Sequence, residues 1–157
     1  GSTLIRFYYG TDLLGTEIGA ASKNVIGLAA GMLDGLELTP LKGALMARAP
    51  REIARLICAM GGREQSAYGL AHLGDYEATL FSSHSHNRRY GEDFVSGRGF
   101  QKLAEGITTT QAIVTLAKKV GVEMPICECV KRILDEEGNP REELDKLISR
   151  PIKREFT

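Results

Sequence analysis

Apolar residues recur at intervals of three and four along the first quarter of the chain, which predicts an amphipathic helix that ends near Gly35. Thr11 and Asp12 directly precede this pattern and supply an N-cap, with the acidic Glu17 close behind. The apolar positions of the pattern are Leu14, Ile18, Ala21, Val25, Ala29, Met32 and Leu36.

The same segment carries a stripe of glycines, mostly four residues apart, and each costs a helix about 1 kcal/mol relative to alanine. They are Gly15, Gly19, Gly27, Gly31 and Gly35. A bare backbone stripe of this kind predicts the close approach of another helix or of a ligand.

Later patterns predict a mainly α fold in one domain over residues 1–157. Pro50 interrupts the first of these patterns, so we expect a kink there or two helices that meet. Residues 87–97 (NRRYGEDFVSG) are expected to lead into a loop, and residues 4–10 (LIRFYYG) read as one short strand. The helical segments are 39–60, a short helix within 68–83, 111–120, 125–137 and 141–149.

Composition narrows the function classes. Twenty basic residues balance twenty acidic ones, so no overall field favours nucleic acid or an anionic membrane. No apolar run is long enough for a membrane span, and three cysteines without CxxC spacing fit a reducing compartment, so we expect a cytoplasmic protein. The start, Gly1-Ser2, lacks methionine and reads as a tag remnant, so we expect a piece of a longer protein.

Lys23 is the first candidate for chemistry, because it lies in a run of small and apolar residues with Gly19 and Gly27 four residues away on either side. Apolar surroundings disfavour the charged form of a lysine, which suits a proton donor or acceptor near neutral pH. The alternative is a lysine that extends to solvent. Asn24 offers an amide for a hydroxyl, and Asp75 is either a helix N-cap or a hydroxyl acceptor.

The stretch SHSHNRRYG at residues 83–91 allows several interpretations. Zinc would need about four ligands, and the chain offers His72, Asp75, His84 and His86. Nucleic acid is disfavoured by the neutral charge and the absence of tryptophan. An anion cradle fits better, with Ser85, Asn87, Arg88 and backbone amides around a phosphate, while a solvated surface loop stays open. Glu105 could cap a helix, pair with an arginine or accept from a ligand.

Five motifs in this order resemble the C-terminal, substrate-binding domain of NAD(P)-dependent glycerol-3-phosphate dehydrogenase over nearly the whole chain. The motif TDLLGTEIGAASKNVIGLAAGMLDGL, which begins at Thr11, resembles the family's TDVxGVExGGAxKNVxAIAAGxxDGL. GLAHLGD is similar to GLAGLGD, SHNRRYG to SRNRRFG, AEGITTT to VEGxxT, and VEMPICECV to VEMPIxEAV.

The resemblance implies a helical bundle like that of 6-phosphogluconate and glycerol-3-phosphate dehydrogenases. It implies that Lys23 is the general acid/base for glycerol 3-phosphate or dihydroxyacetone phosphate. The implied substrate contacts are Lys23, Asp75, Ser85, His86, Asn87 and Arg88, and the implied contacts with NAD or NADP are His86, Leu103 and Glu105. It further suggests a homodimer. From the residue patterns themselves we expect no metal and no nucleic-acid or membrane partner.

The chain departs from the family pattern at three places. It has no glycine-rich dinucleotide fingerprint after a strand, so the Rossmann domain is absent, residues 4–10 would be a strand left from it, and the chain alone should be inactive. His86 replaces the family's first arginine, and ARAPREI, with Pro50, replaces TRGLxEM. A related dehydrogenase with another hydroxy substrate and a non-catalytic helical dimerisation or binding module stay as alternatives.

Overall fold

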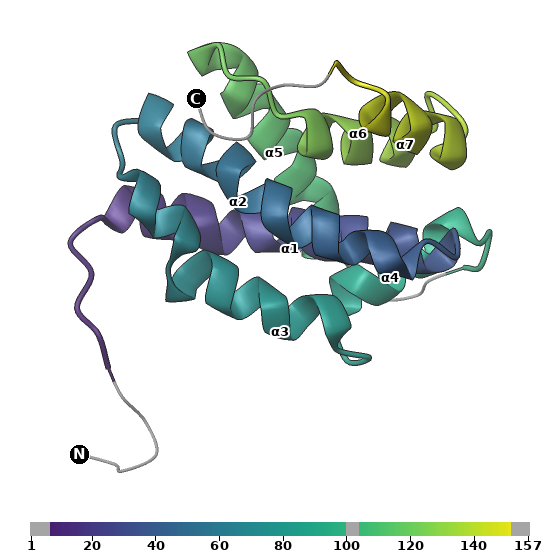
Figure 1. Ribbon diagram of the computed structural model, residues 1–157, viewed down its shortest axis with the longest axis horizontal. Coiled ribbons are helices and arrows are strands. Elements are labelled where there is room, and N and C mark those ends of the chain that lie inside the picture. The colour runs from purple at the N-terminus through teal and green to yellow at the C-terminus, as the bar shows by residue number, and fades with distance from the viewer. Residues whose placement is uncertain (1–6, 100–103, 152–157) are drawn as a thin grey trace.

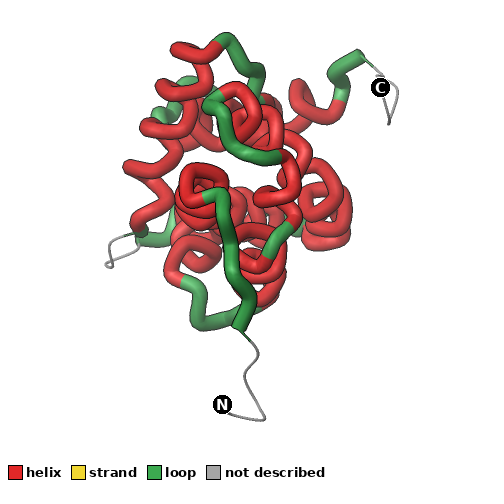
Figure 2. Tube along the Cα trace, turned by 90° about the vertical axis from the view of Figure 1, so that its left-hand side faces the viewer, coloured by secondary structure: helices red, strands yellow, loops and turns green. Residues whose placement is uncertain are grey.

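The computed structural model describes residues 7–99 and 104–151, and every regular element within these ranges is helical (Figures 1 and 2). The predicted mainly α fold is confirmed. The elements are α1 (Leu13–Gly35), η1 (Thr39–Leu41), α2 (Lys42–Ala59), η2 (Glu64–Tyr68), the π-helical turn η3 (Leu70–Gly74), α3 (Asp75–Phe81), α4 (His86–Val95), α5 (Glu105–Val120), α6 (Pro125–Leu134) and α7 (Pro140–Ile148).

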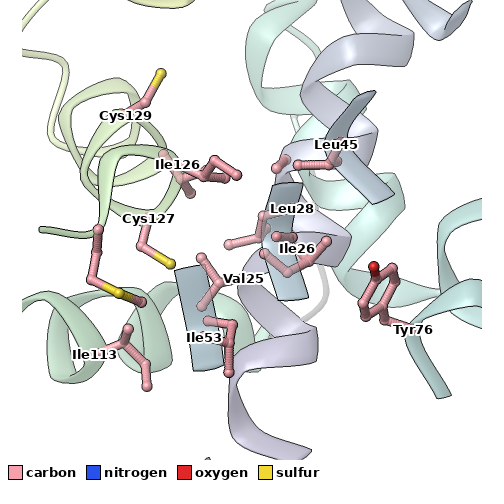
Figure 3. Packing of buried hydrophobic residues seen from close by; sticks show 14 of the residues in the cluster. Val25, Ile26, Leu28, Leu45, Ile53, Tyr76, Ile113, Ile126, Cys127 and Cys129 are labelled. Carbon is pink, nitrogen blue, oxygen red and sulfur yellow. The ribbon is translucent and has the colours of Figure 1, made fainter. Parts of the chain in front are cut away.

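Helix α1 forms the centre of the fold and packs against α2, α3, α4, α5 and α6, while α7 packs on α6 (Figure 1). Its side chains Val25, Ile26 and Leu28 are fully buried. Figure 3 shows them in one cluster with Ile53 of α2 and Cys127 of α6. The predicted N-cap is also present, since the Asp12 carboxylate accepts the Gly15 N–H at 3.0 Å.

The glycine stripe of α1 is occupied mainly by α4. A Cβ added at Gly31 would lie 1.8 Å from the carbonyl oxygen of Arg88, and a Cβ at Gly91 of α4 would lie 2.2 Å from the carbonyl oxygen of Leu28. The two backbones therefore touch directly, which only glycine permits. This contact confirms the expected close approach of another helix. Because α4 of the same chain covers much of the stripe, the stripe does not by itself indicate self-association.

One local expectation is incomplete, and a second is tested only in part. Residues 87–97, expected to lead into a loop, lie mostly within α4, because the Ser85 hydroxyl caps its start and the glycine contact with α1 compensates for its poor helix formers. Residues 7–10 form no strand, and residues 4–6 lie outside the described ranges. Leu103 also lies outside them.

Helix α2 continues through Pro50 and does not divide into two helices there. Proline has no N–H, so the carbonyl of Met46 loses its usual partner within the helix. The Tyr76 hydroxyl of α3 donates to this carbonyl at 2.7 Å. The tertiary contact thus replaces the hydrogen bond that Pro50 removes.

The N-terminus of α6 is capped from α2 by the buried Glu52 carboxylate, which accepts the N–H groups of Ile126 and Cys127, both at 2.9 Å. These N–H groups have no partner inside the helix. Burial raises the pKa of Glu52 to about 7, although the two N–H groups act in the opposite direction.

No helix in residues 7–99 or 104–151 has both the length and the apolar character to cross a membrane.

Candidate functional site

Lys23 of α1 and Asp75, the first residue of α3, form an ion pair in which the Lys23 ammonium donates to Asp75 Oδ2. The two side chains are 29% and 46% exposed, so a small molecule can reach both. Lys23 is thus neither buried among apolar walls nor free in solvent. Asp75 does not cap α3, whose N-cap residue is Gly74, and its carboxylate is instead directed to the lysine.

A chain of amides joins α1, α4 and α5 beside this pair. Asn87 Nδ2 donates to Asn24 Oδ1 at 3.0 Å, and Asn87 Oδ1 accepts the Gly106 N–H at 2.9 Å. Asn24 Nδ2 lies 3.5 Å from Glu105 Oε2. The structure therefore connects Asn24, which directly follows Lys23 in α1, with Asn87 of α4 and Glu105 of α5, although 81 residues separate Asn24 from Glu105.

The importance of Asn24 was not evident from the sequence, in which its amide could equally bind a substrate hydroxyl or satisfy a helix end. In the structure it is the link between Lys23, its neighbour in the chain, and the N-terminus of α5. The signal available in the sequence was its position directly after the lysine on a helix rich in glycine.

Ser85, His86 and Arg88 differ in their availability to a ligand. Ser85 Oγ accepts the Arg88 N–H at 3.3 Å and caps α4, while His86 is exposed at the first position of that helix. Arg88 is only 15% exposed and donates through Nη1 to Asp34 at 2.5 Å and to Glu92 at 3.1 Å. Its charge is therefore already paired inside the protein.

An open depression of about 520 Å³ lies along α4. Its walls carry both signs of charge, and Arg98 is paired there with Asp93 and Glu92. The lining residues are Ser83, Arg88, Arg89, Glu92, Asp93 and Arg98. Ion pairs within the protein therefore already engage two of the three arginines in this lining, Arg88 and Arg98.

The histidines lie in different environments. His72 is fully buried, its Nδ1 hydrogen-bonds the Gly19 carbonyl at 2.9 Å, and burial lowers its pKa to about 4. His84 and His86 are exposed. The described ranges contain no cluster of three or more histidine, cysteine or acidic side chains arranged for a metal ion.

Comparisons with known proteins agree on one family. Residues 12–145 match the family described as NAD-dependent glycerol-3-phosphate dehydrogenase C-terminus. Glycerol-3-phosphate dehydrogenase [NAD(P)+] 1 of Salinibacter ruber is 42% identical over 96% of this chain and 47% of its own length. The glycerol-3-phosphate dehydrogenase [NAD(P)+] of Thermus thermophilus is 43% identical over 96% of this chain and 48% of its own.

A solved structure shows the same fold. The crystal structure of glycerol-3-phosphate dehydrogenase from Coxiella burnetii superposes with a TM-score of 0.85 and 32% sequence identity, over 96% of this chain and 49% of that one. The chain therefore spans about half the length of the relatives that it matches.

Proposed function

Because the chain belongs to the family of NAD-dependent glycerol-3-phosphate dehydrogenase C-terminal domains, we propose that it is the substrate-binding half of such an enzyme. The whole enzyme would interconvert dihydroxyacetone phosphate and sn-glycerol 3-phosphate with NAD(P)H. The observation that carries this proposal is the solvent-accessible Lys23–Asp75 pair beside the amides of Asn24 and Asn87.

Lys23 is the proposed general acid/base. During reduction the C2 oxygen of the ketone gains negative charge, and a positioned ammonium donates a proton to it. In the reverse direction the neutral amine accepts the proton of the C2 hydroxyl. Asp75 holds the ammonium in place through its Oδ2 and offers its other oxygen to a substrate hydroxyl.

The nicotinamide cofactor, when bound, exchanges a hydride with C2 of the substrate. Two described residues fit its approach, since Glu105 and His86 are both exposed at the starts of α5 and α4, which the Asn87–Gly106 hydrogen bond holds together. Leu103 is proposed as a further contact on the resemblance alone. Most of the cofactor site would lie outside this chain, and the chain alone should therefore be inactive.

For the phosphate group we propose Ser85, His86 and Asn87, with Arg88 in an indirect role. His86 is exposed and can face a ligand, but an imidazole lacks the bidentate guanidinium of the family's arginine. This departure favours, as a second candidate, a related dehydrogenase whose hydroxy substrate carries less charge.

We also propose a cytoplasmic homodimer with no nucleic-acid or membrane partner, which sedimentation and fractionation would test.

The experiment is a dehydrogenase assay on a form that spans the relatives' whole length. Dihydroxyacetone phosphate should be reduced with NAD(P)H, and K23M should lower kcat by about 100-fold or more, the upper part of the range for general acid/base catalysis. K118A, which removes an exposed lysine from α5, is the matched control and should leave kcat unchanged. Full turnover by K23M would contradict the role of Lys23, and turnover of only non-phosphorylated substrates would favour the second candidate.

A further inference from the structure

A largely buried carboxylate between two cations lies next to the candidate site. Asp34 Oδ2, near the end of α1, accepts from Lys42 Nζ and from Arg88 Nη1, each at 2.5 Å. Asp34 Oδ1 accepts the Thr39 hydroxyl at 2.8 Å. The exposed fractions of the Asp34, Lys42 and Arg88 side chains are 13%, 5% and 15%. We name these three residues the Asp34 triad.

The two cations of the Asp34 triad also hold the connection between α3 and α4. Lys42 Nζ donates to the carbonyl of Leu80 at 3.0 Å, and Arg88 Nε donates to the carbonyl of Ser82 at 3.0 Å. Both carbonyls belong to the end of α3 and the turn after it. One carboxylate therefore fixes, through two cations, the backbone that connects the two helices.

This connection joins two halves of the candidate site. Asp75, the partner of Lys23, begins α3, and Asn87, the partner of Asn24, lies in the first turn of α4. Because Arg88 directly follows Asn87, the ion pair with Asp34 also sets the position of the α4 turn that carries the Asn87 amide.

We propose that Asp34 is a positioning residue for the substrate site, which it holds in register through Lys42 and Arg88. Arg88 thereby positions the site through its contacts with Asp34 and the Ser82 carbonyl, and it does not bind the substrate's phosphate. Burial alone raises the pKa of Asp34, but the hydrogen bonds from Lys42, Thr39 and Arg88 lower it below its usual value overall, so the carboxylate is charged at neutral pH. The expected effect of Asp34 on substrate binding rests on the proposed function, whereas its expected effect on the position of Asn87 does not.

The chain contains a matched control for this arrangement. Glu143 of α7, whose side chain is 3% exposed, likewise accepts from two cations, Arg132 and Lys146. This second cluster joins α6 and α7, and among the described contacts it does not involve the α3–α4 connection. Neutralising either carboxylate should lower stability, but only the Asp34 change should disturb the site.

The structural arm of the experiment uses the 157-residue chain and the exchange of the Gly106 amide proton, measured by NMR. This N–H donates to Asn87 Oδ1, so its protection reports the position of Asn87. D34N should lower the protection of Gly106 by about tenfold or more, the order expected when one buried hydrogen bond is lost. E143Q should leave it unchanged at equal loss of overall stability.

R88K supplies a second variant should D34N fail to fold, because it keeps the charge and removes the donor to Ser82. It should lower the protection of Gly106 in the same direction as D34N. Unchanged protection in D34N, or in R88K where D34N does not fold, overturns the proposal. An equal loss in E143Q overturns it as well.

The catalytic arm uses the full-length form. D34N should raise KM for dihydroxyacetone phosphate by about tenfold and change kcat by less than about threefold, the pattern of lost substrate binding, while E143Q should change neither. If the wild-type full-length form has no dehydrogenase activity, the proposed function fails, and the exchange of Gly106 still decides the role of Asp34. An unchanged KM in D34N with active wild type contradicts the proposed positioning of the substrate site.

Discussion

Replacing Gly31 by alanine tests whether direct backbone contact between α1 and α4 holds the molecule together. The new Cβ would lie 1.8 Å from the Arg88 carbonyl oxygen and 2.8 Å from the Glu92 nitrogen. Both atoms belong to the backbone, so no side-chain rotation can relieve the clash, and α4 must move away. Such overpacking costs up to about 3 kcal/mol, whereas alanine in place of glycine gains about 1 kcal/mol of helix propensity.

The expected net loss for G31A is therefore about 2 kcal/mol in the free energy of unfolding, measured by urea denaturation. G43A is the matched control, because a Cβ at Gly43 in the first turn of α2 meets no atom within 4 Å. This control should be neutral or more stable by up to about 1 kcal/mol. A G31A variant as stable as the wild type would refute the direct contact between the α1 and α4 backbones.

Two other contacts and one substitution give further predictions. Y76F should lower the free energy of unfolding by about 1–3 kcal/mol, because the Met46 carbonyl becomes unsatisfied. P50A restores the N–H that this carbonyl lacks and should reduce the loss in a double-mutant cycle, whereas purely additive effects would contradict the explanation. Between about pH 4.5 and 7 folded Glu52 retains a proton that the unfolded chain releases, so the free energy of unfolding should fall by up to about 3 kcal/mol as pH rises. In urea titrations E52Q should flatten this dependence on pH, and equal slopes in E52Q and the wild type would exclude Glu52 as its cause. In the full-length form, H86R should lower KM for dihydroxyacetone phosphate by about tenfold, since a guanidinium binds phosphate with two donors, and an unchanged KM would place His86 away from the phosphate.

The central helix could be predicted from the sequence because its signals are local. Its apolar spacing is regular, Asp12 caps it, and its end coincides with Gly35. The glycine stripe also predicted a close neighbour correctly. The identity of that neighbour could not be predicted, because α4 is stabilised at Gly91 by backbone contact and carries few apolar residues that would mark it as a helix.

Helix α5 shows a second limit of local patterns. It begins at Glu105, ahead of the predicted start at residue 111. The sequence pattern missed the first turns because they contain a run of threonines, which are poor helix formers. In the structure the hydroxyls of Thr109 and Thr110 donate back to carbonyls four residues earlier, and Asn87 accepts the Gly106 N–H. These hydrogen bonds satisfy the polar groups that the pattern left unexplained.

The charged residues of the candidate site show why the sequence alone does not predict which side chains pair with one another. Lys23 and Asp75 were both candidates, yet nothing local relates two residues 52 positions apart, and their pairing follows only from the packing of α3 on α1. Arg88 was a candidate for the same anion as His86, but the glycine contact draws α4 so close to α1 that its guanidinium meets Asp34. Two basic side chains on the same turn of α4 thus differ in environment, because the helix places Arg88 toward the largely buried Asp34 carboxylate and His86 toward solvent.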